Sequence, residues 1–195
     1  MANKDAAFGL RPIGKVGQNK DNQGLSEYNI AANSSAIYQN DTVQFLATGY
    51  VGVADTSAAV LLGSLNGVFY TDTADQKPRW ANHLAASNAA TDIVGFVSDD
   101  PYERFEVQSS TTLAIADIGK NADIVYAAGA SPNFVSKVEV DTTTGNMTSA
   151  TAQFRVVGVA KDIENSELSN ATTYAANVNV VGIINEHFLK STTGI

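Results

Sequence analysis

Few residues of this 195-residue chain have the types and spacing that chemistry requires. The adjacent carboxylates of Asp99 and Asp100 are the first candidates for acid–base work. Neighbouring side chains in a strand or open turn point apart, whereas two catalytic carboxylates must converge on a substrate about 5 to 9 Å apart. Pro101 follows them, and this combination is typical of a turn whose carboxylates accept hydrogen bonds from backbone N–H groups. We therefore expect a turn cap and not a catalytic pair.

Metal chemistry has weak support. His83 and His187 stand alone, with no second ligand at i+2 or i+4, so a site would need both across the fold. The stretch DTTTGN at 141–146 has the acid and the late glycine of a calcium loop. However, Thr143 occupies the place of the next acid and no Glu follows at the required distance. This stretch predicts a hairpin loop, and we expect no metal site.

Other catalytic signatures are absent from the sequence. The chain has no cysteine, which excludes disulfides, thiolate metal sites and a Cys nucleophile. There is no phosphate loop, no Gly-x-Ser-x-Gly elbow and no dinucleotide fingerprint. Glycosylation motifs at Asn33, Asn40, Asn146 and Asn170 are what a chain so rich in Asn and Thr produces by chance. We predict a protein that is not an enzyme and has no cofactor.

The stretch that would position the two carboxylates is residues 93–108, IVGFVSDDPYERFEVQ. A nearly continuous apolar run at 93–97 is typical of a strand covered on both faces. After the turn, Phe105 and Val107 alternate with polar residues, which indicates a second strand. We interpret the stretch as a hairpin. Two later segments, VVGVAKD from Val156 and VVGIINE from Val180, repeat the pattern of its first strand.

The same patterns recur along the chain and predict its fold class. At least eight short strands are separated by turns of Gly, Asn, Asp and Pro, including strong ones at 154–159 and 178–184. Residues 113–119 indicate a single helical turn that ends at Gly119. The sequence therefore predicts an all-β protein, either a β-sandwich or a jelly-roll-like barrel. At this length roughly 70% of the unfolded surface should become buried.

The first 25 residues differ from the rest in charge and in pattern. They carry four basic and two acidic side chains, a net charge of +2. Because the whole chain has a net charge of −8, the remaining residues carry −10. Four glycines and Pro12 interrupt any regular pattern there. We predict an extended N-terminal arm over 1–25 and a single β-body over 26–195, with a frayed terminus as the alternative. The predicted partner-binding residues of the arm are Phe8, Leu10, Arg11, Pro12 and Ile13.

Charge and hydropathy also limit the partners and the location. An acidic body argues against direct nucleic-acid binding, which depends on phosphate neutralisation by basic side chains. The N-terminus lacks the apolar core of a signal peptide, and no segment approaches the ~20 apolar residues that span a bilayer. We expect a product made in the cytoplasm that does not enter a membrane. Only 16% of the residues are charged, and such a surface suits packing against other subunits.

A possible surface contact lies at Arg79 and Trp80, where the only tryptophan stands beside an arginine. Both residue types are enriched at binding hot spots, so the pair could form a recognition patch. In the alternative interpretation, which we favour, Trp80 packs on the core and Arg79 lies over it.

Several short motifs, taken in order, resemble one protein family. The chain is similar to small capsid-associated proteins of tailed bacteriophages, often called cement or decoration proteins. The matching motifs are AFGLRP (7–12), YNIA (28–31), AIYQNDTV (36–43), GVF (67–69), Trp80, DDP (99–101) with FEVQ (105–108), IGKNA (118–122) and NEH (185–187).

This resemblance implies a virion structural protein that sits on the capsid shell and binds the major capsid protein. It also implies self-association, as a homotrimer on local threefold axes of the shell. In that role a basic arm would reach a neighbouring subunit while the rigid body presents the main contact surface. The alternative is a phage tail or surface adhesin that binds host glycan, with Arg79, Trp80 and Tyr70 as the stacking site.

Overall fold

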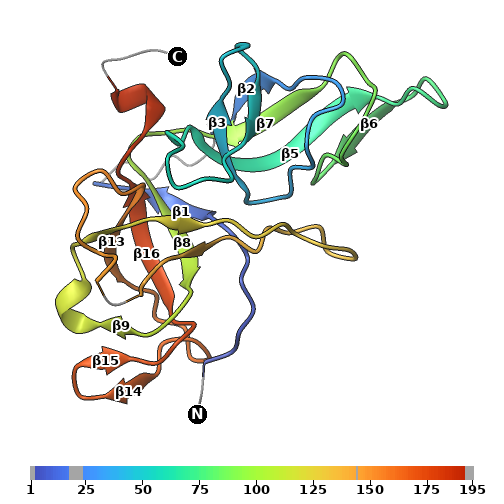
Figure 1. The fold of residues 1–195 in the computed structure, drawn as a ribbon. Helices are drawn as coiled ribbons and strands as arrows, with labels where there is room; N and C mark the ends of the chain where they lie inside the picture. Colours follow the sequence, from blue (N-terminus) through green and yellow to red (C-terminus); the bar gives the residue numbers. More distant parts are fainter. Residues whose placement is uncertain (1–2, 18–23, 144, 192–195) are drawn as a thin grey trace.

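The computed structural model describes residues 3–17, 24–143 and 145–191. In these residues the chain forms sixteen short strands and two single-turn 3-10 helices, and no α-helix occurs among them. The strands lie in three sheets (Figure 1). The predicted all-β class is therefore confirmed.

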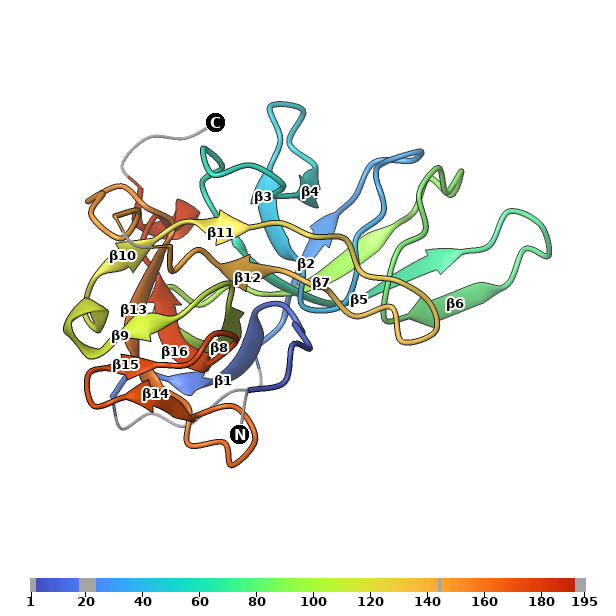
Figure 2. The same ribbon diagram turned by 60° about the horizontal axis from the view of Figure 1, so that its bottom comes forward.

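The first sheet is a nearly closed barrel (Figure 2). Its strands are β1 (Arg11–Lys15), β8 (Glu103–Ser109), β10 (Asn121–Ala122), β11 (Ile124–Val125), β12 (Glu139–Val140), β13 (Phe154–Val159) and β16 (Asn179–Ile184). They follow the order β10-β13-β16-β8-β12-β11, with β1 beside β8. The first and last strands of this order are separated in the chain only by Asp123, so the sheet turns back on itself.

Two predicted strands form one side of the barrel. The strands β13 and β16 correspond to the predicted segments 154–159 and 178–184, and they pair antiparallel. Phe154 and Val180 are fully buried in the barrel core together with Phe105 and Val107 of β8. A side chain at Gly182 would collide with the Phe154 ring and the Arg155 carbonyl. This glycine therefore allows the largest core residue of β13 to lie against β16.

The second sheet has a hydrophobic core of its own. Its strands are β2 (Ser26–Asn29), β3 (Thr42–Phe45), β4 (Val51–Val53), β5 (Gly63–Thr71), β6 (Pro78–Ala81) and β7 (Val94–Ser98). The order is β2-β7-β5-β3-β4, with β6 beside β5. The β5–β6 hairpin extends away from the barrel, at the upper right of Figure 1. The predicted single body thus contains two cores, one for each large sheet.

The remaining elements are small. A third sheet joins β14 (Leu168–Asn170), β15 (Thr173–Tyr174) and β9 (Leu113–Ala114). The two 3-10 helices are η1 (Ile115–Asp117) and η2 (Phe188–Lys190). The predicted helical turn corresponds to η1, and Gly119 after it has a φ of +97°, as expected for a residue that ends such a turn.

The predicted hairpin over 93–108 is wrong, because its two strands belong to different sheets. Both edges of β7 are occupied, by β2 and by β5, while β8 pairs with β1, β12 and β16. The turn between them is held by N-terminal strands. Asp99 accepts hydrogen bonds from Ser26 and Tyr28 of β2, and Asp100 pairs with Lys15 of β1 at 2.8 Å. These contacts lead the chain from one sheet into the other.

The N-terminal segment also differs from the prediction. Residues 11–15 form β1, which pairs antiparallel with β8, and the Leu10 side chain is fully buried in the barrel core. Residues 3–17 therefore belong to the body, and the expected boundary at residue 25 does not separate them from it. Residues 18–23 lie outside the described part of the chain.

Polar side chains hold this segment before it reaches β1. Asn165 and Gln108 accept hydrogen bonds from the backbone N–H groups of Lys4 and Ala6, both at 2.9 Å. Further along, the Asn40 side chain donates to the carbonyl of Phe8. A side chain at Gly9, whose φ is +74°, would collide with the Asn40 carbonyl and with Ser136. The segment thus needs no regular strand pattern to be fixed on the body.

Candidate interaction surface

One face of the second sheet exposes a cluster of aromatic side chains on β5, β6 and β7. In the register of these strands Phe69 lies opposite Trp80, and Gly67 lies opposite Phe96. Directly opposed residues share a face of a sheet, so Phe69, Trp80 and Phe96 lie on the same side. We call these three residues the aromatic face.

The aromatic face is tightly arranged yet open to solvent. The rings of Trp80 and Phe96 contact each other, with centroids 4.7 Å apart and planes inclined by 53°. A Cβ atom at Gly67 would lie 2.9 Å from Cζ2 of Trp80, so the glycine makes room for the indole. Trp80 is nevertheless 57% exposed and Phe69 is 40% exposed. Rigid, exposed aromatic side chains are typical of binding hot spots.

Arg79 does not join Trp80 in this cluster. Adjacent residues of a strand point to opposite faces, and Arg79 lies opposite Tyr70 on the other side of the hairpin. Its guanidinium pairs with Asp72 at 2.6 Å and with Asp75 at 2.9 Å. The predicted Arg79–Trp80 patch is therefore wrong, and so is the stacking site of Arg79, Trp80 and Tyr70, because Trp80 lies on the opposite face from the other two. The interpretation that buries Trp80 under Arg79 is wrong as well, because the indole is exposed.

The structure places the five predicted arm residues against the body. Leu10 is fully buried in the barrel core, so its side chain cannot reach a partner in this arrangement. The Arg11 guanidinium lies over the Phe8 ring at 4.6 Å from its centroid and pairs with Glu106 at 2.7 Å. Pro12 is half-buried in β1, and Ile13 is 43% exposed. Ile13 is the most exposed of the four apolar residues in this set, and the Arg11 side chain is 51% exposed.

The candidate acid–base residues serve structural roles. The carboxylate of Asp100 accepts a hydrogen bond from the Tyr102 N–H at 2.7 Å, which confirms the predicted turn cap for this residue, whereas Asp99 accepts from the side-chain hydroxyls of Ser26 and Tyr28. Asp141 likewise accepts from the N–H of Thr143 at 2.9 Å and from the Asn146 side chain. The loop at 141–146 therefore uses its acid as a cap for its own turn.

The two histidines lie in different environments. His83 stacks on Phe134, with centroids 3.9 Å apart and planes within 4°, and burial lowers its pKa. His187 is buried, and its Nδ1 accepts a hydrogen bond from the Leu189 N–H. Burial, helped by the charge of Lys190, lowers the pKa of His187 to about 4. In the described part of the chain no group of three or more His, Asp or Glu side chains is placed to hold a metal ion.

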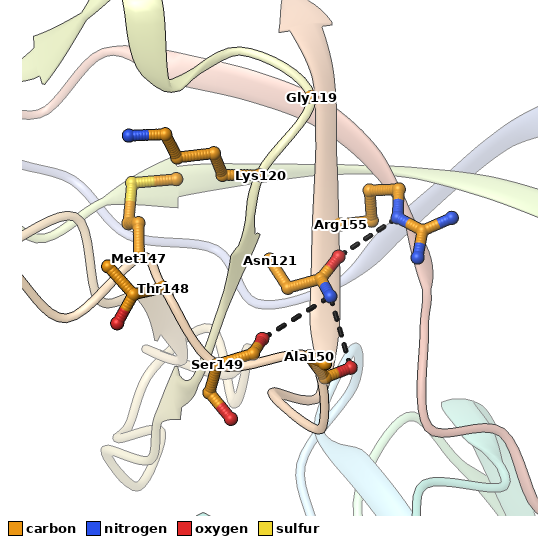
Figure 3. Close-up of a pocket in the computed structure, with 8 residues that line it drawn as sticks. All are labelled: Gly119, Lys120, Asn121, Met147, Thr148, Ser149, Ala150 and Arg155. Carbon is orange, nitrogen blue, oxygen red and sulfur yellow. Dashed lines mark hydrogen bonds between the residues drawn. The ribbon is translucent and has the colours of Figure 1, made fainter.

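A pocket of about 380 Å³ is lined by residues 119–121 at the start of β10, by the loop at 147–150 and by Arg155 of β13 (Figure 3). Its polar side chains already have partners. Arg155 donates to Asn121 at 2.9 Å and to Asn185 at 2.6 Å, and Lys120 pairs with Asp117 at 2.6 Å. No carboxylate lines the pocket. Its side chains therefore stabilise the barrel end and supply no acid–base pair.

One buried acid was not singled out from the sequence. Asp41 is fully buried, and its Oδ2 accepts a hydrogen bond from the Tyr38 N–H at 2.7 Å. Burial raises the pKa of Asp41 to about 6, although this N–H and the Ser136 hydroxyl favour the charged form. Asp41 lies before β3, where the sequence indicates only a turn.

Phe69 and Phe96 were also missed as surface residues. Both lie in predicted strands, so alternation indicates that they point away from Val68 and Val97, which are buried. Which face of the sheet is covered depends on the neighbouring strands, and alternation in the sequence does not identify these strands. The exposure of Phe69 and Phe96 could therefore not be predicted.

Comparisons with protein-family models, with curated proteins and with solved structures found no significant match for this chain. Among the helices of the described residues, none has the length and apolar character needed to cross a membrane. The functional assignment therefore rests on the residues and geometry above.

Proposed function

We propose that this protein is a virion structural protein that decorates and stabilises a bacteriophage capsid by binding the shell of major capsid proteins. The observation that carries the proposal is the aromatic face, an exposed apolar surface whose rings contact each other on one side of the second sheet. The sequence motifs shared with capsid cement proteins support the same role.

The aromatic face has the properties of a protein-binding surface. At the outward-facing positions of β5, β6 and β7 the register brings Phe69, Trp80 and Phe96 together, and the charged residue Glu27 of β2 lies opposite Phe96 at the border. An apolar centre with a polar rim is typical of specific interfaces. Covering the exposed parts of Trp80 and Phe69 should contribute of order 1 to 3 kcal/mol each.

Adhesion is the mechanism of this function. A protein that binds only the assembled shell stabilises that shell by mass action, because dissociation of the lattice must also release the bound protein. Each copy adds buried interface between neighbouring capsid subunits, which opposes the outward pressure of packaged DNA. No bond is made or broken, so no catalytic group is required.

The test compares two variants that each remove one exposed aromatic side chain. Trp80→Ala removes the centre of the aromatic face, whereas Tyr50→Ala removes a 41% exposed ring from the turn between β3 and β4. Purified protein is mixed with undecorated shells and the bound fraction is measured by co-sedimentation. We expect Trp80→Ala to weaken binding roughly tenfold to a hundredfold and Tyr50→Ala to bind like the parent.

Two results would overturn the proposal: unchanged binding by the Trp80 variant, or no binding to shells by the parent protein. The second candidate function, a glycan-binding adhesin, is favoured by one observation, since a flat exposed indole is also a stacking platform for a sugar ring. The adhesin would be supported instead if the parent protein binds oligosaccharide but not shells and Trp80→Ala abolishes the oligosaccharide binding.

A further inference from the structure

The most exposed large apolar side chain among the described residues is Ile163, which is 98% exposed. It lies at the tip of the loop between β13 and β14, next to the acidic residues Asp162 and Glu164. Single exposed apolar residues are ordinary on protein surfaces, but they are usually partly covered by neighbouring side chains. This isoleucine makes almost no such contact within its own chain.

The loop that carries Ile163 is held on both sides of the tip. Asp162 accepts a hydrogen bond from the Asn179 side chain at 3.1 Å, and its backbone carbonyl accepts one from the Ser166 hydroxyl. Asn165 is buried and donates to the carbonyls of Lys4 and Asn177. The exposed side chain is therefore presented by a fixed loop, and little conformational entropy would be lost when it binds.

A pocket of about 470 Å³ lies directly beside this side chain. Its apolar walls include Val159, Leu168 and Tyr174, and Ile163 itself forms part of the rim. Leu168 is 49% exposed, so the pocket has an uncovered apolar wall. Lys161 and Asp162 line the same pocket, and the Asp162 carboxylate accepts its hydrogen bond from Asn179. An exposed apolar side chain with Glu164 beside it thus lies next to a pocket whose apolar wall is accompanied by Lys161 and Asp162.

We propose that this surface binds a second copy of the chain across a twofold axis, with Ile163 of each copy in the pocket of the other. The apolar side chain suits the apolar wall of the pocket, and Glu164 beside Ile163 is opposite in charge to Lys161 at the pocket. Because Ile163 also lines the pocket, one patch supplies both halves of the contact. A contact made by the same patch on both molecules is isologous and has twofold symmetry.

This contact differs from the threefold association that the family resemblance implies. A threefold ring needs two different patches that face in different directions, whereas here the side chain and its pocket adjoin. The contact is also independent of the aromatic face, which lies on the second sheet.

The experiment uses the full chain, and its lack of cysteine makes single-thiol variants clean probes. Ile163→Cys is treated with a short bismaleimide, and Val60→Cys, at a 40% exposed position before Leu61, is the matched control. We expect covalent dimers from the Ile163 variant and only traces from the control. Equal yields from the two variants would overturn the proposal.

Sedimentation velocity of the unmodified protein provides the second measurement. We expect a reversible dimer whose dissociation constant rises about a hundredfold or more in Ile163→Asp, because two buried isoleucines are lost per dimer. Thermal unfolding should be unchanged in this variant, since the side chain contacts little of its own chain. A parent protein that is monomeric or trimeric, or a dimer that Ile163→Asp leaves intact, would contradict the proposal.

Charge exchange separates this contact from any other dimer. Lys161→Glu and Glu164→Lys should each weaken the dimer, since each creates repulsion between like charges across the axis. The double variant should recover affinity because it restores opposite charges. If the double variant is as weak as the sum of the single changes, the two residues do not face each other and the proposed geometry is wrong.

Discussion

Replacing Asp41 by asparagine should make the protein more stable near neutral pH. The folded-state pKa of this carboxyl is about 6 against an ordinary value of 3.8, because burial disfavours its charge. The folded state therefore binds the proton more tightly than the unfolded state, and ionised Asp41 lowers stability above that range. A difference of this size corresponds to roughly 3 kcal/mol, which is recovered as the pH falls from above 6 to below 4.

Asparagine keeps the interaction that the fold uses. Its side-chain oxygen can still accept the hydrogen bond from the Tyr38 N–H, while the buried charge is removed. His187 titrates in the opposite sense over an overlapping range. Its pKa is lowered from 6.5 to about 4, so the stability that neutral His187 gives is lost as the pH falls through this window. In the parent protein the two effects oppose each other.

The assay is chemical denaturation followed by circular dichroism at several values between about pH 8 and pH 4. We expect Asp41→Asn to raise the free energy of unfolding by roughly 2 to 3 kcal/mol near pH 8 and not to change it near pH 4. The variant should therefore lose stability as the pH falls, because the effect of His187 is no longer opposed by that of Asp41. Asp5→Asn makes the same charge change at an exposed site and is the control. A variant that is less stable than the parent near pH 8, or a gain that persists near pH 4, would refute the reasoning.

Two further predictions concern the N-terminal segment and the aromatic face. Leu10→Ala should lower the free energy of unfolding by about 2 to 5 kcal/mol because Leu10 is fully buried, whereas the exposed Ile13→Ala control should be as stable as the parent. If the parent and both variants are equally stable, the segment is a free arm. Gly67→Ala places a Cβ atom 2.9 Å from Trp80 and 3.0 Å from the Ala81 carbonyl. It should cost roughly 1 to 3 kcal/mol, change the emission of the single tryptophan and weaken shell binding. Unchanged emission would show that the indole does not lie over Gly67.

The fold class could be predicted from the sequence because strand signals are local. Alternation and β-branched runs identify segments such as β13 and β16, and Gly119 identifies the end of η1. Strand partners depend on contacts between distant residues, which a period of two does not specify. The predicted hairpin failed for this reason. The turn after β7 binds Ser26 and Tyr28, which come about seventy positions earlier in the chain.

The N-terminal segment shows a second limit of pattern-based prediction. Its apolar residues correctly indicated that the segment is anchored, and Leu10 is buried as an anchor should be. The prediction that these residues contact another subunit is wrong for Leu10, because the barrel core of the same chain covers its side chain. The backbone is held by the side-chain amides of Asn165, Gln108 and Asn40, and isolated amides give no signal in the sequence. The charge of the segment carried no information about this.

The N-terminal segment connects the two proposed binding surfaces. The side-chain amide of Asn165, the residue that holds the Ile163 loop, accepts a hydrogen bond from the Lys4 N–H at 2.9 Å and donates one to the Lys4 carbonyl at 3.0 Å. Six residues later the Leu10 carbonyl accepts a hydrogen bond from the buried Ser64 hydroxyl of β5, the strand that carries Phe69. The segment can therefore affect attachment without contacting a partner, because it is hydrogen-bonded both to a loop of the barrel and to a strand of the second sheet. A truncation that weakens shell binding would then also lower stability, whereas loss of a partner-binding arm would weaken binding alone.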